Sequence, residues 1–84
     1  MLTREELALV LRTAVSDVLG TDIDDVREQT SLLADFGIDS LELMEIGARL
    51  ERALALRVEI EDLTGAHNVG QAIDLLHQRV GGRV

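Results

Sequence analysis

Apolar residues recur near the start of the chain with the three- and four-residue spacing of a helix. The motif Thr3-x-x-Glu6 comes directly before them and is a capping box, in which each side chain bonds the backbone N–H of the other residue. The pattern stops at Gly20, and glycine readily adopts the left-handed conformation that follows many helices. We therefore predict a first helix over about residues 4–19. Its apolar face comprises Leu7, Val10, Leu11, Ala14, Val15 and Val18.

A long connection, residues 21–38, follows this helix and is rich in aspartate. Loops of this length in small domains are usually functional or tied down. Apolar residues interrupt the polar ones at intervals, so we expect them to fix the loop onto the helices, with a single helical turn around residues 31–34. These apolar residues are Ile23, Val26, Leu32, Leu33, Phe36 and Ile38.

A second helix is predicted from the capping pattern Asp39-x-x-Glu42, with either Asp39 or Ser40 as the N-terminal cap and Gly37 providing the bend. Leu41 and Met44 lie outside the apolar stripe of this helix. Its end is not marked, because no glycine or proline occurs between residues 48 and 64, and local rules permit a helix to about residue 63. The stripe consists of Leu43, Ile46, Gly47, Leu50 and Leu54.

The motif Asn68-x-x-Gln71 is a further capping box and predicts the start of a final helix, which Gly81-Gly82 ends. Its inward residues are Val69, Ala72, Ile73, Leu76 and Val80.

These elements make up one domain, residues 1–84, of the all-α class. Hydrophobic residues form 46% of the chain and Phe36 is the only aromatic residue, so the core must consist of Leu, Val, Ile and Ala. This composition and the absence of proline favour helices over a β-sandwich. We predict a small helical bundle with a long first loop.

The formal net charge is −8, from 16 acidic residues against 8 arginines. Such a balance disfavours nucleic acid and anionic membrane surfaces, and it favours partners with basic patches. The absence of cysteine excludes disulfides, thiolate zinc sites and a native thiol nucleophile. No segment approaches the roughly 20 apolar residues that a membrane span needs. We expect a cytoplasmic monomer, and the start at Met1 without linker sequence favours a freestanding protein.

No catalytic or metal site is predicted. His67 and His77 lack clustered partners at metal-ligand spacing, so we expect both at the surface. Asp22, Asp24 and Asp25 resemble the start of a calcium loop without its glycine and closing glutamate, which favours a solvated acidic loop over a loosely held divalent ion. Paired carboxylates for acid–base catalysis need a pocket, for which a short bundle poor in aromatic residues has little room.

Ser40 is the residue with the most informative position. It lies in the first turn of an acidic amphipathic helix, and no His, Lys or Cys occurs in the twenty residues before it. A serine without a base is a poor nucleophile but a good attachment point. Serine is also a preferred N-cap residue, which is the structural alternative. A phosphate ester on Ser40 would lie beside unpaired N–H groups and the positive end of the helix dipole.

The sequence Gly37-Ile38-Asp39-Ser40-Leu41, followed by this acidic helix, resembles the phosphopantetheine attachment motif of acyl carrier proteins. The resemblance extends over nearly the whole chain, through Thr30-Ser31-Leu32 and Asn68-Val69-Gly70. The resemblance implies a small antiparallel four-helix bundle, with three main helices, a short third helix and a long first loop. It implies that a phosphopantetheinyl transferase attaches 4′-phosphopantetheine from coenzyme A to Ser40. The arm supplies the thiol that the sequence lacks, and acyl groups are carried on it as thioesters. The protein itself is then not an enzyme.

The resemblance also implies two surfaces. The first half of the second helix is the main docking face for partner enzymes in this family, such as acyltransferases, ketosynthases or adenylating enzymes with basic patches. Here the docking residues are Asp39, Leu41, Glu42, Met44 and Glu45. An acyl chain is sheltered where the bundle opens, and the residues lining that pocket are Ile46, Gly47, Leu50, Leu54, Val58, Leu63 and Ala66.

The chain departs from the family pattern in several places. Val58 is followed by Glu59 where the family usually has proline, and Arg49, Arg52 and Arg57 make the second half of the docking helix less acidic. These features favour a specialised carrier in polyketide or hybrid peptide–polyketide biosynthesis over a housekeeping fatty-acid carrier. Two alternatives stay open: a peptidyl or aminoacyl carrier, which Asp39 disfavours, and an acidic helical adaptor without a prosthetic group.

Overall fold

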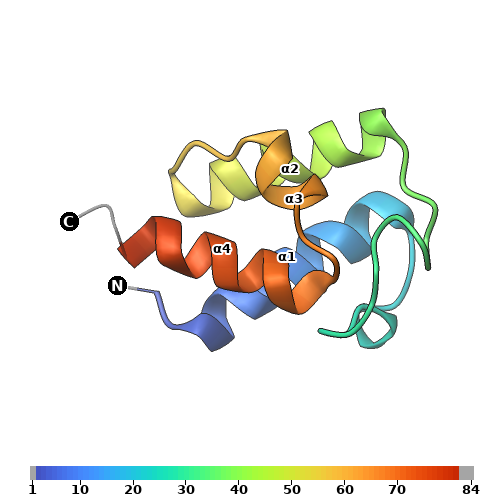
Figure 1. Ribbon diagram of the computed structural model, residues 1–84, viewed down its shortest axis with the longest axis horizontal. Helices are drawn as coiled ribbons and strands as arrows, with labels where there is room; N and C mark the ends of the chain where they lie inside the picture. The colour runs from blue at the N-terminus through green and yellow to red at the C-terminus, as the bar shows by residue number, and fades with distance from the viewer. Residues whose placement is uncertain (1, 82–84) are drawn as a thin grey trace.

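The computed structural model describes residues 2–81, and all the regular secondary structure in this range is helical. The elements are α1 (Arg4–Leu19), a short 3₁₀ helix η1 (Ile23–Asp25), α2 (Ser40–Leu54), α3 (Ile60–Thr64) and α4 (Val69–Gly81). Helix α1 runs antiparallel to α2 and α4, and the short α3 lies between α2 and α4 (Figure 1). This arrangement confirms the predicted all-α bundle with three main helices, a short third helix and a long first loop.

The first helix forms as its capping box predicts. The Glu6 N–H donates to Thr3 Oγ1 at 3.1 Å, and the Thr3 N–H donates to Glu6 Oε1 at 2.9 Å. At the other end, Gly20 has φ +70° and its N–H donates to the Ser16 carbonyl at 2.8 Å. Four of the six predicted inward residues are buried, while Val10 and Val18 are half-buried at the edges of the core.

Helix α2 ends at Leu54, well before residue 63, and α3 is a separate helix. Ala55 adopts φ +53°, a left-handed conformation that ends the helix without glycine. The Val58 N–H then donates to Glu51 Oε2 at 2.9 Å, so α2 itself holds the connection that leads to α3. A left-handed alanine costs about 1–2 kcal/mol, which other interactions in the fold must offset.

The last helix starts with a shifted version of the predicted capping box. The Gln71 N–H donates to Asn68 Oδ1 at 2.8 Å, but Gln71 Oε1 accepts from the His67 N–H at 2.8 Å instead of from Asn68. Gly81 lies within α4 and the predicted stop at Gly82 lies outside the described residues. None of the helices in residues 2–81 is long and apolar enough to span a membrane.

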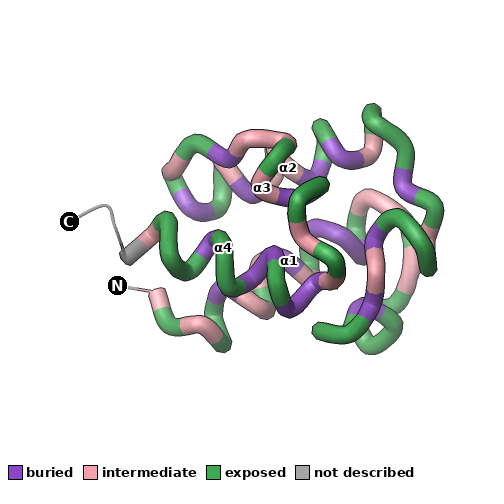
Figure 2. The backbone as a smooth tube through the Cα atoms, viewed as in Figure 1, coloured by how far each residue is buried: buried purple, intermediate pink, exposed green. Residues whose placement is uncertain are grey.

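A single apolar core lies between α1, α2 and α4, and the long first loop contributes to it (Figure 2). Val26 is fully buried, and Leu32 and Ile38 are buried as well, which confirms that the loop is fixed onto the helices. Leu33 is the exception among the predicted anchors, because its side chain is 52% exposed. Ile23 and Phe36 are half-buried at the edge of the core.

Hydrogen bonds from α1 also fix the loop. Arg12 Nε donates to the Val26 carbonyl at 2.6 Å, and Arg12 Nη2 donates to the Ile23 carbonyl at 3.1 Å. The expected helical turn is present: the Asp35 N–H donates to the Ser31 carbonyl at 2.9 Å, and the turn ends at Gly37 with φ +62°. The η1 turn was not predicted, because its residues are mostly aspartate.

The loop is joined to the start of α4 by backbone hydrogen bonds. The Val69 N–H donates to the Thr30 carbonyl at 2.9 Å and the Gly70 N–H donates to the Glu28 carbonyl at 2.8 Å. These loop carbonyls satisfy N–H groups that have no partner within the helix. Gly70 permits the close approach, since a Cβ atom there would lie 3.2 Å from the Glu28 carbonyl oxygen.

Arg4 reinforces this junction from the first turn of α1. Its Nη2 lies 2.8 Å from Glu28 Oε1 in the loop, and its Nε lies 2.7 Å from Asp74 Oδ1 in α4. The hydrogen bond from Arg4 lowers the pKa of Glu28, and the two carboxylates raise the pKa of Arg4. Three segments that are distant in sequence therefore meet at one ion-pair cluster, which we name the Arg4 cluster: Arg4, Glu28 and Asp74.

We predict that the folding stability of Glu28→Gln changes less with acidic pH than that of the wild-type protein. Because folding lowers the pKa of Glu28, its contribution is complete above the ordinary pKa of glutamate and is lost as the pH falls through the lower folded-state value. The variant should be less stable than wild type near neutral pH and should lose less stability between about pH 5 and pH 3. Urea unfolding at a series of pH values measures both effects.

Glu61→Gln is the matched control, since Glu61 is exposed and no side-chain partner binds its carboxylate within residues 2–81. It should keep the wild-type pH dependence. Parallel curves for wild type and Glu28→Gln would contradict a role of the Arg4 cluster in acid stability.

Candidate functional site

Ser40 is the first residue of α2, and Asp39 is the cap of this helix. Asp39 Oδ1 accepts a hydrogen bond from the Glu42 N–H at 2.8 Å, and Glu42 Oε1 accepts one from the Asp39 N–H at 3.1 Å. The Leu43 N–H donates to the Asp39 carbonyl at 3.0 Å. The sequence left Asp39 and Ser40 as alternative caps, and the structure assigns this role to Asp39.

The hydroxyl of Ser40 is consequently free. Its side chain is exposed and forms no hydrogen bond within the described part of the chain. The two other serines are both in use: the buried Ser16 donates to the Thr13 carbonyl at 3.0 Å, and Ser31 Oγ accepts from the Ala34 N–H at 3.0 Å. Ser40 is therefore the one serine with an exposed and unbonded hydroxyl.

No side chain among residues 2–81 forms a hydrogen bond with this hydroxyl. Within residues 2–81 the carboxylates nearest in sequence, Asp39 and Glu42, are bound to backbone N–H groups, and neither bonds Ser40 Oγ. A serine without a general base is a weak nucleophile, so a reaction at Ser40 requires a base from another molecule. The N-terminus of α2, a helix of 15 residues, carries the positive end of the helix dipole and therefore favours a nearby negative charge, such as a phosphate on Ser40.

Two exposed apolar side chains lie close to Ser40 on α2. Leu41 is 76% exposed and Met44 is 59% exposed, whereas Leu43 and Ile46 of the same helix are buried. Glu45 is exposed next to Met44 and pairs with Arg49, with Glu45 Oε1 3.2 Å from Arg49 Nε. All five predicted docking residues thus lie in the first two turns of α2 or at its cap, although Asp39 and Glu42 also form the capping box.

The predicted acyl-pocket residues divide into two groups. Five of the seven are in the buried core, and Gly47 and Ala66 are half-buried. A hollow of about 190 Å³ lies between α2 and the α2–α3 connection, and Gly47 and Val58 belong to its lining. Sequence reasoning assigned Met44 to docking and missed the other lining residues, which are Leu43, Ala48, Glu51 and Ile60. Ile60 reaches the hollow because it begins α3, and no sequence signal marked where α2 ends and this short helix begins.

The histidines lie where they were expected. Both His67 and His77 are exposed, and the described residues contain no cluster of three or more histidine, aspartate or glutamate side chains with the geometry to hold a metal ion.

Fold and site together define a small helical protein with one free serine at the start of an acidic helix. The family described as "Phosphopantetheine attachment site" matches residues 10–76, a range that includes Ser40 and most of all four helices. The chain belongs to this family. Its members are non-catalytic carriers, and membership implies a 4′-phosphopantetheine prosthetic group.

Three relatives with similar sequences are acyl carrier proteins. An acyl carrier protein of Thermotoga maritima is 30% identical over 96% of this chain and 100% of its own length. Polyketide-8 synthase acyl carrier protein 2 of Streptomyces avermitilis is 32% identical over 84% of this chain and 82% of its own length. The meromycolate extension acyl carrier protein of Mycolicibacterium smegmatis is 31% identical over 84% of this chain and 72% of its own length.

The residues present fit such a prosthetic group. A phosphate ester needs an accessible hydroxyl, and Ser40 supplies the one exposed serine hydroxyl that has no other partner. Neither the core nor the cap of α2 would have to change on modification, because Asp39 carries the capping hydrogen bond.

We predict that Asp39→Ala destabilises the protein more than Ser40→Ala does. Ser40→Ala should change the free energy of unfolding by less than about 0.5 kcal/mol, since no hydrogen bond is lost. Asp39→Ala should lower it by about 1 kcal/mol through loss of the cap. Urea unfolding of the two variants measures the difference. A loss of about 1 kcal/mol in Ser40→Ala would mean that Ser40 is a structural cap after all.

Proposed function

We propose that this protein carries acyl or polyketide intermediates on a 4′-phosphopantetheine arm attached to Ser40 and presents them to partner biosynthetic enzymes. The observation behind the proposal is that Asp39 and Ser40 have different roles at the start of α2. Asp39 caps the helix, so the Ser40 hydroxyl is left without a structural role. When bound, the arm supplies the thiol on which an acyl group is held as a thioester.

The attachment reaction requires a second protein. Ser40 Oγ attacks the phosphorus next to the pantetheine of coenzyme A, the pyrophosphate bond breaks, and adenosine 3′,5′-bisphosphate leaves. The Ser40 proton must pass to a base, and residues 2–81 place none in contact with this hydroxyl. We therefore propose a phosphopantetheinyl transferase as the first partner. Asp39 supports the reaction by holding the first turn of α2, so that Ser40 is presented on a fixed backbone.

The docking face for this and later partners is proposed to be the first half of α2. Leu41 and Met44 offer exposed apolar contact, and Glu45 and Asp39 add negative charge on either side. A patch of this kind fits an apolar contact surrounded by lysine and arginine on the partner, whose charge speeds association. The net charge of −8 strengthens the long-range attraction.

We propose that the acyl chain enters the bundle through the hollow beside Gly47. Gly47 leaves open space there, since no atom lies within 4 Å of the position of a Cβ. The far wall is the α2–α3 connection and α3, a helix of five residues held to its neighbours by Val58–Glu51 and Arg79–Asp62 contacts. Displacement of this short wall would open the hollow toward the buried face of α2, which includes Ile46 and Leu50.

Loading by a promiscuous phosphopantetheinyl transferase tests the proposed function. With coenzyme A and magnesium, wild-type protein should gain the mass of one phosphopantetheine, and Ser40→Ala should gain none. The acidic adaptor without a prosthetic group remains the alternative if wild type is not loaded. An equal gain of mass in Ser40→Ala would assign the modification to another residue. The matched Ser31→Ala variant should be loaded like wild type.

Charge reversal at Glu45 tests the docking face. Glu45→Arg should slow loading about fivefold at low salt and have a smaller effect at high salt, because salt screens exposed charges. Glu45 is preferred to Glu42 for this test, since Glu42 is also part of the capping box. The control is Glu5→Arg, at the start of α1, at the opposite end of the molecule from the start of α2 (Figure 1). Equal slowing at both salt concentrations would contradict electrostatic docking at this face.

A further inference from the structure

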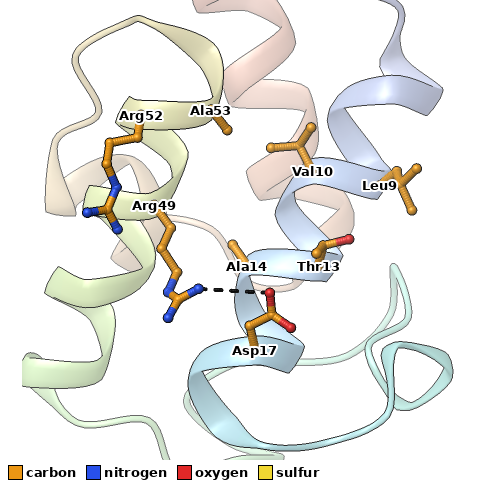
Figure 3. Close-up of a pocket in the computed structure, with 8 residues that line it drawn as sticks. All are labelled: Leu9, Val10, Thr13, Ala14, Asp17, Arg49, Arg52 and Ala53. Carbon is orange, nitrogen blue, oxygen red and sulfur yellow. Dashed lines mark ion pairs between the residues drawn. The ribbon is translucent and has the colours of Figure 1, made fainter.

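An open groove lies between α1 and α2, away from Ser40 (Figure 3). Its volume is about 570 Å³, three times that of the hollow beside Gly47. The floor and one rim are apolar and are formed by Leu9, Val10, Ala14 and Ala53. Leu9 is 57% exposed, although it is a large apolar residue in the middle of a helix. Helix rise places Arg52 about 18 Å along α2 from Ser40, so this groove and the attachment site are separate.

The α2 rim of the groove carries two arginines with different environments. Arg49 points across the groove toward α1, where its Nη1 lies 3.8 Å from Asp17 Oδ2, and it also pairs with Glu45 (Figure 3). Arg52 is exposed and makes no hydrogen bond or ion pair within residues 2–81. The other arginines in this range all bond a carboxylate or a backbone carbonyl. Arg52 therefore offers an unpaired cation next to an apolar floor, on a protein whose net charge is −8.

The shape and charge of the groove favour a helix as its occupant. A row of side chains from an amphipathic helix fits a surface groove between two helices, as in other helix-in-groove interactions. Leu9 stands on the rim, where a helix lying along the groove would cover it. A small ligand would find one free cation and little enclosure. A second copy of this chain would bring another −8 charges to the contact, which opposes self-association.

We propose that the α1–α2 groove is a second docking surface, which binds an amphipathic helix of a partner protein that carries a carboxylate beside its apolar residues. The apolar residues of the partner helix lie on Val10, Ala14 and Ala53 and cover Leu9, and the carboxylate pairs with Arg52. This surface accepts an acidic partner segment, whereas the first half of α2 suits a basic one. The proposal does not depend on modification of Ser40.

The test is selection of a displayed library of helix-forming peptides against the unmodified full chain. The positions on one face of the peptide are randomised, and binders of the double variant Leu9→Glu/Arg52→Glu are removed first. We expect enriched peptides to carry apolar residues at i, i+3 or i+4 and i+7, with an aspartate or glutamate beside them. In ¹⁵N-labelled protein the best peptide should shift the amide signals of Leu9, Thr13, Arg52 and Ala53.

Single variants then separate the groove from general effects of charge. Leu9→Glu and Arg52→Glu should each weaken binding of the selected peptide by about fivefold or more. The matched controls are Leu75→Glu on α4 and Arg57→Glu in the α2–α3 connection, which should change it by less than about twofold. Circular dichroism confirms that all four variants fold.

Several results would overturn the proposal. One is the absence of any enriched peptide, and another is enrichment of peptides without acidic residues. Amide shifts confined to the first half of α2 would assign binding to the other docking face. Sedimentation of the free protein as a dimer that Leu9→Glu dissociates would make a second copy the occupant. Tighter binding of dodecanoate than of any selected peptide, with shifts at the same residues, would make the groove a small-molecule site.

Discussion

The contact between the first loop and the start of α4 is the constraint on which the rest of the structure depends. Two loop carbonyls, those of Glu28 and Thr30, accept the N–H groups of Gly70 and Val69, and Arg4 joins the same place from α1. This junction makes an eighteen-residue connection part of the core. Once residues 28–30 are fixed, the path to α2 is short, and the turn that ends at Gly37 delivers the chain to the start of that helix. The position of Ser40 is thus determined by contacts at both ends of the loop.

Helix α2 serves the core and the surface at the same time because its two faces are sharply divided. Leu43, Ile46 and Leu50 are buried, and Leu41 and Met44 stand exposed within the same turns. The capping box adds to this division. The side chains of Asp39 and Glu42 accept hydrogen bonds from backbone N–H groups, and the Ser40 side chain stays exposed to solvent. A serine cap would have been equally stable but would have engaged the hydroxyl. Because Asp39 forms the cap, the Ser40 hydroxyl stays available for modification, and no stabilising hydrogen bond would be lost.

Local signals predicted those parts of the structure that local interactions determine. The capping boxes at Thr3 and Asp39 predicted where α1 and α2 begin, and the apolar stripes predicted most of the core. The end of α2 had no such signal, because Ala55 adopts the left-handed conformation that glycine usually supplies at the end of a helix. No sequence signal marks the loop–α4 junction either, because it consists mainly of hydrogen bonds between backbone N–H groups and carbonyls. The sequence suggested both roles of Asp39, cap and docking residue, but only the geometry assigned the cap to Asp39 and not to Ser40.

The charge on α2 changes sign along the helix, and this change has a consequence for how partners are arranged. Glu42 and Glu45 lie in the first half with Ser40. In the second half Arg49 and Arg52 lie beside the groove and outnumber the single acidic residue there, Glu51. A helix of fifteen residues held in a packed bundle keeps the two halves at a fixed distance. A partner helix bound in the groove would leave Ser40 uncovered, since about 18 Å of helix separates it from Arg52. The groove can therefore orient the protein on one partner while the free serine end faces another.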